Sequence, residues 1–290
     1  MDTNAVSIGE KWLPYRESGT EHIFTVHSVF GRALNISNNC QLLSIVASGM
    51  GGSSAFLTLP GRDLALGATV GEICTLHAGR VITLKNTINF CDSPVWKRPI
   101  SNGYRQEKVK KDNITAFKAV LDRKAAPQSA WRNINSGAGS RFKGLSVIKQ
   151  LKENPSLARN LIGLGIGLTP AGDDLLVGFL AMVNHTCEDR DYINLLHGSV
   201  AAHLNNTVDF SAKMLANALD CDYHASVQKC IRDLCEGESE DIYISAASLI
   251  NMGATSGSDI ACGMYYGMLD PEVQQYEPII KGELCNRKPC

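Results

Sequence analysis

Short apolar stretches with a period of two residues dominate the first hundred positions of the chain. Residues 23–30 (IFTVHSVF) alternate in this way, and three further segments are short, apolar and partly β-branched: 42–47 (LLSIVA), 55–59 (AFLTL) and 81–84 (VITL). Such segments favour β-strands. Turn-forming residues separate them at 49–54 (GMGGSS) and 60–63 (PGRD). The pattern predicts a β-rich domain over residues 1–105, built as a compact barrel or sandwich.

From residue 112 onward the apolar spacing changes to that of helices. Asp112 or Asn113 is expected to cap the first helix, and a second is expected over 145–151, before Pro155. Asn206 or Thr207 is expected to cap a later helix. The remaining helical patterns span 192–204, 208–219, 225–234, 242–250 and 259–269. The sequence therefore predicts an α+β fold, with a mostly helical domain over residues 106–290 following the β-rich one.

Composition and charge narrow the class of protein. The formal net charge is −1 over 290 residues, so neither nucleic acid nor an anionic membrane is an expected partner. Ten cysteines are present, but none has the spacing of a zinc site, and the first twenty residues contain no apolar signal segment. No apolar run is long enough to cross a membrane. We expect a cytoplasmic protein with reduced thiols.

The most informative segment is 161–182, LIGLGIGLTPAGDDLLVGFLAM, in which a glycine-rich loop and two adjacent aspartates lie between apolar stretches. A loop with glycine at every second position exposes backbone N–H groups, and the helix that follows adds unpaired N–H groups and a partial positive charge. Together they suit a phosphate, carboxylate or carbamoyl oxygen. The candidate substrate-binding residues are Gly165, Gly167, Thr169 and Gly172.

The adjacent carboxylates Asp173 and Asp174 allow three interpretations. They could cap the helix that begins near Asp173. They could hold Mg²⁺ that bridges to a bound phosphate. They could instead bind an amide NH₂ group of a ligand. The sequence leaves these alternatives open. The loop is neither a Walker loop nor a dinucleotide fingerprint, because it lacks the lysine of the former and precedes Thr-Pro.

A second motif repeats this pattern at 253–268, GATSGSDIACGMYYGM. Aligning its Gly-Ser-Asp with the earlier Gly-Asp-Asp places Asp259 on Asp174 and Gly263 on Gly178. In each copy the later glycine lies one helical turn after the aspartate, where a small residue allows close approach of another helix. Two helix N-termini facing one cavity would explain the repeat. The candidates added here are Ser256, Gly257 and Asp259.

Two further groups of polar residues are candidates for the site. Thr207 and Ser211 would share one helix face and could line a polar pocket, or serve only as a cap and a surface serine. Arg32 and Asn35 follow the first long strand and could bind an anionic substrate, or act as turn residues.

The two glycine-rich motifs together resemble a bacterial family typified by AllH, which is associated with the oxamate carbamoyltransferase of anaerobic allantoin degradation in purine catabolism. The resemblance rests on Gly-x-Gly-x-Thr-Pro-x-Gly-Asp-Asp and on Thr-Ser-Gly-x-Asp, with weaker support from Asn-Thr-x₃-Ser. It implies a complex with AllF-type and AllG-type subunits. It also implies transfer of a carbamoyl group from oxalurate to phosphate, giving oxamate and carbamoyl phosphate.

Three functional hypotheses follow from these patterns. In the first, the chain is an enzyme subunit acting on a small anionic substrate, and Asp173, Asp174 and Asp259 are catalytic. In the second, it is a non-catalytic scaffold subunit whose glycines serve close helix contact. In the third, the paired aspartates belong to a Mg²⁺-dependent hydrolase.

Overall fold

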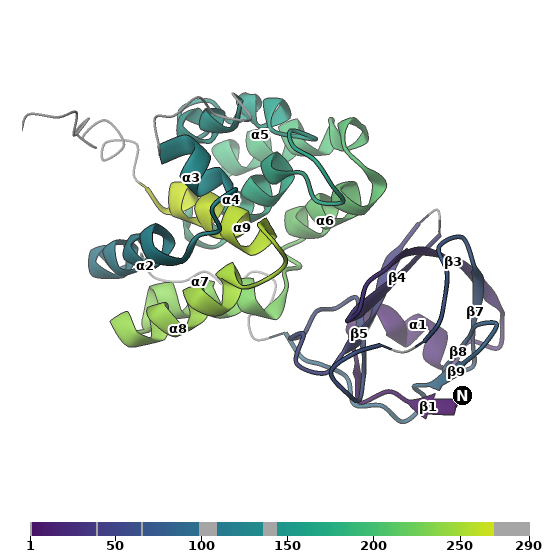
Figure 1. The fold of residues 1–290 in the computed structure, drawn as a ribbon. Helices are drawn as coiled ribbons and strands as arrows, with labels where there is room; N and C mark the ends of the chain where they lie inside the picture. The colour runs from purple at the N-terminus through teal and green to yellow at the C-terminus, as the bar shows by residue number, and fades with distance from the viewer. Residues whose placement is uncertain (1, 39, 65, 99–108, 136–143, 270–290) are drawn as a thin grey trace, which may run out of the picture.

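The fold is α+β, as predicted, with strands in the first third of the chain and helices in the rest (Figure 1). The computed structural model describes residues 2–38, 40–64, 66–98, 109–135 and 144–269. We call residues 2–98 the strand-rich half and residues 109–269 the helical half. The predicted boundary at residues 105 and 106 lies outside the described residues, so the domain division stays a prediction.

One nine-stranded sheet forms the strand-rich half, in the order β1-β9-β8-β7-β3-β4-β5-β6-β2. The two outermost strands, β1 and β2, are consecutive in the sequence and are joined by Ala5 and Val6. The N–H of Ala5 donates to the carbonyl of Asn89 in β9, and the N–H of Val6 donates to that of Thr58 in β6, at opposite ends of the sheet. The sheet therefore curls around its own core. The strands are β1 (Asp2–Asn4), β2 (Ser7–Ile8), β3 (His22–Val29), β4 (Ala33–Ser37), β5 (Leu42–Ala47), β6 (Phe56–Leu59), β7 (Ile73–His77), β8 (Arg80–Ile82) and β9 (Thr87–Asn89).

Inward-facing side chains of this sheet make a core of their own. Trp12 and Tyr15, from the short helices η1 (Glu10–Trp12) and α1 (Leu13–Arg16), are buried with Phe24 of β3 and Phe90. Trp12 and Phe90 meet edge to face, with ring centroids 5.5 Å apart. All four predicted strand segments contain a strand. The prediction did not include β1, β2, β4, β7 and β9.

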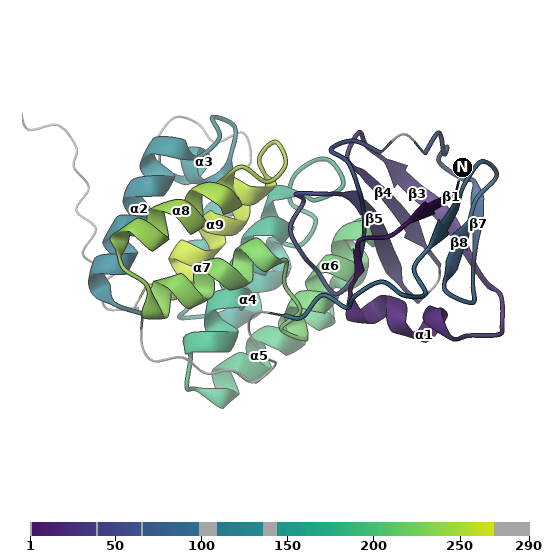
Figure 2. The ribbon, with the colours of Figure 1, turned by 90° about the horizontal axis from the view of Figure 1, so that it is seen from below.

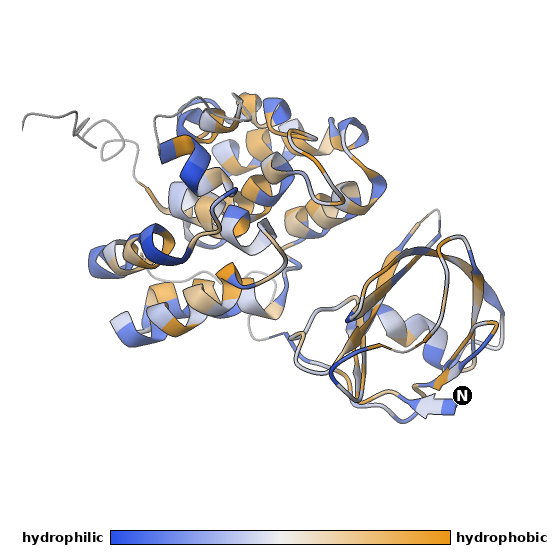
Figure 3. Cartoon of the chain, in the orientation of Figure 1, coloured by the Kyte–Doolittle hydropathy of each residue, from blue (hydrophilic) through white to orange (hydrophobic). Residues whose placement is uncertain are grey.

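The helical half surrounds α4 (Ala171–Thr186), whose residues 172–183 are all buried. The other elements are α2 (Lys111–Lys124), α3 (Ala130–Asn135), η2 (Leu145–Gln150), η3 (Pro155–Asn160), α5 (Arg190–Ala201), η4 (Leu204–Asn206), α6 (Asp209–Leu219), α7 (Ala225–Glu236), α8 (Ser239–Ile250) and α9 (Ser256–Met268). Apolar residues run along the central helices, whereas α2 and α3 carry strongly hydrophilic turns (Figure 3). Among the described residues, none of the helices is both long and apolar enough to cross a bilayer, and the eight cysteines are all free.

The predicted caps were wrong at several helices. α2 has Lys110 as its N-cap in place of Asp112 or Asn113, and α6 has Val208 in place of Asn206 or Thr207. The expected helix over 145–151 is a 3₁₀ helix. At α4 the N-cap is Pro170, which places Asp173 and Asp174 inside the first turn. The capping interpretation of the two aspartates is therefore wrong, and their carboxylates serve other partners.

Polar contacts join the two halves at the segment between α6 and α7. Asp222 is buried there; it accepts a hydrogen bond from Ser54 and forms an ion pair with Lys11 at 2.9 Å. The backbone of Ala225 donates to Gly52 at 2.8 Å, and His224 bonds to the carbonyl of Met50. The contact leaves most of the sheet away from the helices, as the two perpendicular views show (Figures 1 and 2).

Candidate functional site

The two glycine-rich motifs lie side by side because α4 and α9 pack with their backbones in contact. A Cβ atom added to Gly178 would lie 1.9 Å from the carbonyl oxygen of Ile260, and one added to Gly263 would lie 1.9 Å from that of Leu175. Further along, a Cβ atom added to Gly267 would lie 3.0 Å from the carbonyl oxygen of Phe179. Residue numbers rise together along both helices, so the helices run parallel. Their N-termini, and the positive ends of their dipoles, meet at one end.

The loop before α4 presents a row of unpaired backbone donors. Its glycines at 163, 165 and 167 have φ values of +74°, +141° and +92°, which only glycine adopts without strain. Within the described part of the chain, no protein acceptor is bonded to the N–H groups of residues 165–169. Ile166 and Gly167 at the loop tip are exposed. Successive N–H groups of this kind form an anion-binding concavity next to a helix N-terminus.

Asp173 holds this loop in place, and both of its carboxylate oxygens accept hydrogen bonds. Its Oδ1 accepts from the N–H of Gly163 at 2.8 Å, and its Oδ2 accepts from the hydroxyls of Thr207 and Ser211. Both Asp173 and Ser211 are fully buried. Thr207 and Ser211 therefore support the loop through Asp173. Neither of them is the N-cap of α6, which is Val208.

Replacing Asp173 by asparagine should destabilise the protein by about 1–3 kcal/mol, because an amide cannot accept from all three donors and one is left buried without a partner. The free energy of unfolding in urea measures this loss. Asp63→Asn, at an exposed position in the strand-rich half, is the matched control and should leave the free energy of unfolding unchanged. An unchanged value for Asp173→Asn would show that these hydrogen bonds do not support the loop.

Asp174 differs from its neighbour in having no hydrogen-bond partner of normal geometry. It is 1% exposed, and neither of its carboxylate oxygens has a hydrogen bond of normal geometry. The hydroxyls of Thr169 and Ser256 approach it and bond to each other at 2.8 Å. Burial, and then the nearby charge of Asp259, raise the pKa of Asp174 well above the ordinary value for aspartic acid. A buried carboxyl group of this kind is a candidate for binding a ligand or for transferring a proton.

Asp259 completes the cluster from the first turn of α9. Its Oδ1 accepts from the N–H of Ala130 at 2.6 Å, and Ser258 beside it accepts from the N–H of Ala126. Burial raises the pKa of Asp259 to about 7, although the hydrogen bond from Ala130 opposes the shift. The sequence did not predict that the N–H groups of Ala126 and Ala130 take part in this cluster, because any residue type can supply a backbone donor.

The remaining glycine candidates serve packing. A Cβ atom on Gly172 would lie 2.0 Å from the carbonyl oxygen of Leu161, and one on Gly257 would lie 2.0 Å from that of Leu249. Each glycine lets a helix start pass close to a preceding backbone segment. Their direct neighbours Asp173 and Ser258 are thereby held at fixed positions.

Arg32 and Asn35 lie elsewhere in the structure. Asn35 is buried in the sheet, where its amide donates to Ser28 at 2.9 Å and accepts from Ser44 at 2.7 Å. Both ends of this amide are satisfied, so it is a structural residue of the sheet. Arg32 is exposed and donates to the carbonyls of Ser48 and Arg62, also in the strand-rich half. The structure thus brings the three aspartates together with Thr169, Thr207, Ser211 and Ser256, but not with these two.

The geometry disfavours a Mg²⁺ site on the paired aspartates. The oxygens of Asp173 already accept three hydrogen bonds. Among the described residues, no group of three or more His, Cys, Asp or Glu side chains is arranged to hold a metal ion.

One family model matches part of the chain. Residues 161–268, which span both glycine-rich motifs, match the model of the family described as oxamate carbamoyltransferase subunit AllH. Over this segment the chain is similar to the AllH family. The match includes the loop, α4 and α9, and with them all three aspartates. The family name indicates a subunit of a multi-subunit complex. No solved structure matches the chain.

Proposed function

We propose that this chain is the catalytic subunit of an oxamate carbamoyltransferase and that the reaction takes place where the N-termini of α4 and α9 meet. The observation that carries the proposal is Asp174, a buried carboxyl without a hydrogen-bond partner of normal geometry beside the unpaired N–H groups of residues 165–169. The AllF-type and AllG-type subunits would be its partners. A purely scaffolding subunit has no need of a buried group that destabilises its fold.

The donors and acceptors of the site fit the two ends of a carbamoyl compound. The loop N–H groups and the helix dipoles favour the anionic end, a phosphate or carboxylate. Asp174, with the hydroxyls of Thr169 and Ser256, faces the uncharged end. The backbone dipoles at the N-termini of α4 and α9 contribute a positive potential to this site.

In the proposed reaction a phosphate oxygen attacks the carbamoyl carbon of oxalurate. The bond from this carbon to the oxamate nitrogen breaks, and the nitrogen takes a proton as oxamate leaves. Hydrogen phosphate loses one proton when carbamoyl phosphate forms, so the reaction needs no external acid. Asp174 would carry this proton by giving its own to the leaving nitrogen and regaining one from the phosphate. The loop N–H groups would stabilise the charge that develops on oxygen.

Titration of the isolated chain with carbamoyl phosphate, oxamate and inorganic phosphate tests whether the site is on this subunit. We expect calorimetry to detect binding of carbamoyl phosphate. Thr169→Val should weaken binding roughly three- to tenfold, which corresponds to one hydrogen bond. Thr115→Val is the matched control, because Thr115 is exposed on α2 and bonds only within its helix. A chain that binds none of the three compounds, yet assembles with its partner subunits, would be the scaffold of the complex.

A further inference from the structure

A second row of unpaired backbone donors lies at the N-terminus of α9. Within the part of the chain that the structure describes, no protein acceptor is bonded to the N–H groups of residues 253–256. Gly253 and Ala254 are exposed, and Gly253 has a φ value of +64°. We call residues 253–256 the α9 loop and residues 165–169 the α4 loop. Each loop lies at the positive end of a helix dipole.

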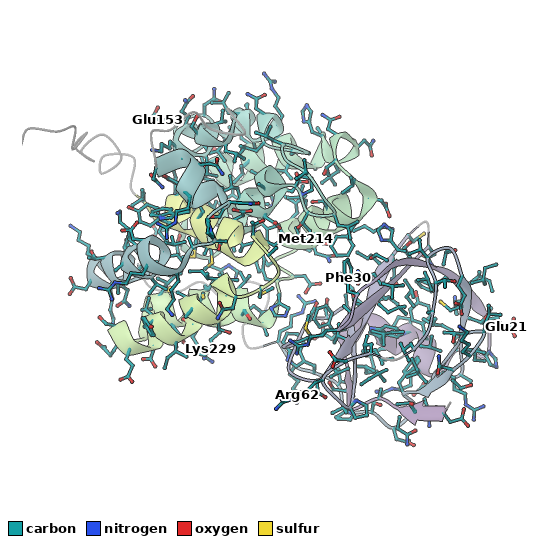
Figure 4. The ribbon with its side chains drawn as sticks, viewed as in Figure 1. Glu21, Phe30, Arg62, Glu153, Met214 and Lys229 are labelled. Carbon is teal, nitrogen blue, oxygen red and sulfur yellow. The ribbon has the colours of Figure 1, made fainter. Side chains whose placement is uncertain are left out.

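The two loops adjoin. The hydroxyls of Thr169 and Ser256, the last residues of the two loops, bond to each other at 2.8 Å. Both loops lie on the side of the helical half that faces the strand-rich half, where Met214 of α6 stands opposite Phe30 (Figures 2 and 4). Because α4 and α9 also run parallel with their backbones in contact, a ligand bound at one loop is within reach of the other.

Asp174 lies between the loops and gives an independent sign of a ligand. It is 1% exposed, neither of its oxygens has a hydrogen bond of normal geometry, and one hydroxyl from each loop approaches it. A buried polar group left in this state requires an explanation, and a bound molecule supplies one. Burial raises the pKa of Asp174 and so favours its uncharged form, which does not repel an anion on either side.

The spacing of the two helices fits the reacting pair of the proposed reaction. Oxalurate carries its carboxylate three bonds from the carbamoyl carbon, roughly 4 Å away. An attacking phosphate oxygen approaches the same carbon to about 3 Å from the other side, and the phosphorus lies one bond further, so the two anions are about 8 Å apart. The axes of two helices in close contact are separated by about 8 Å as well.

We propose that the α9 loop is a second anion subsite, which binds the carboxylate of oxalurate or oxamate while the α4 loop binds phosphate. Three glycines with positive φ values, at 163, 165 and 167, let the backbone before α4 surround the larger anion, whereas the α9 loop has only Gly253 in this conformation. The carbamoyl group then lies between the two anions, beside Asp174. The inference rests on the proposed function. It requires that both substrates are bound at once and that the carbamoyl group passes directly between them.

Calorimetric titration of the full chain with inorganic phosphate, with and without saturating oxamate, tests the second subsite. These two compounds do not react with each other, so the titration is an equilibrium measurement. With two subsites, the dissociation constant of phosphate should change less than about threefold, because screened charges about 8 Å apart repel each other weakly. With one shared subsite, the apparent dissociation constant would rise in proportion to the oxamate concentration.

A charge added to one loop should affect one compound only. Ala254→Glu places a carboxylate beside the α9 loop and should raise the dissociation constant of oxamate roughly tenfold, by repulsion between like charges, with little effect on phosphate. Ile166→Glu, at the tip of the α4 loop, should do the reverse. Both positions are exposed, so folding is not at risk. Thr115→Glu adds the same charge at an exposed position on α2 and should change neither constant.

The outcomes separate this inference from the proposed function. Competition between phosphate and oxamate, or an equal effect of Ala254→Glu on both, would overturn the second subsite and leave one carbamoyl site in place. Binding of phosphate without any binding of oxamate would overturn it as well. A chain that binds neither compound, alone or assembled with its partner subunits, would contradict the proposed function itself, and the second subsite with it.

Discussion

Asp174→Asn is expected to lower the turnover of the reconstituted complex by about 100-fold or more, the range that a positioned proton carrier contributes. Asparagine has nearly the same shape as aspartic acid and can still accept a hydrogen bond, but it carries no exchangeable carboxyl proton. Since the hydroxyls of Thr169 and Ser256 approach Asp174 without hydrogen bonds of normal geometry, and the amide oxygen of asparagine can still accept from them, we expect little structural loss from the substitution. The measurement is the rate of phosphate-dependent oxamate release at saturating oxalurate.

Stability measurements separate this role from a structural one. The raised pKa values of Asp174 and Asp259 mean that the folded protein binds more protons than the unfolded chain above the ordinary aspartate pKa. Stability of the unchanged protein should therefore fall as the pH rises from about 4 towards 7. Asp174→Asn should show a shallower fall and should be at least as stable at pH 8, because the buried ionisable group is gone.

The neighbouring aspartate gives the matched comparison. Asp173→Asn should lose stability, whereas Asp174→Asn should keep it and lose turnover. A turnover of Asp174→Asn close to that of the unchanged complex would remove Asp174 from the reaction. A large loss of stability in that variant would instead mean that its carboxylate has a structural partner.

The sequence located the candidate site, but it could not distinguish the roles of the two adjacent aspartates. Glycine spacing identified the loop before α4 and the helix starts at both motifs, because only glycine meets these backbone requirements. Asp173 and Asp174 are chemically identical in the sequence. Their difference comes from Thr207 and Ser211, which lie more than thirty residues away and reach only one of them.

The predictions that were wrong also concern residues whose roles depend on partners distant in the sequence. Asn35 was a candidate ligand because an amide after a strand is polar, yet its neighbours Ser28 and Ser44 satisfy it inside the sheet. Pro170 caps α4 although two aspartates stood nearby. Local pattern predicts elements well only where the element does not depend on such distant partners.

The second large effect is expected at the contact between α4 and α9. Gly178→Ala should destabilise the protein by about 3 kcal/mol or more, because the added methyl group would overlap a backbone carbonyl that cannot rotate away. The contact in question is the 1.9 Å approach to the carbonyl oxygen of Ile260. The midpoint of urea unfolding measures the loss. Alanine is the better helix former by roughly 1 kcal/mol, so helix propensity alone predicts the opposite sign.

Gly198→Ala is the matched control for this prediction. Gly198 also lies inside a helix, α5, but an added Cβ atom would meet nothing within 4 Å. Its substitution should stabilise the protein by roughly 0.5–1 kcal/mol. Opposite signs for the two substitutions would show that backbone contact decides the outcome at Gly178. If both variants gained stability, α4 and α9 would not be in backbone contact, and their N-termini would lack the fixed spacing on which the proposed carbamoyl site depends.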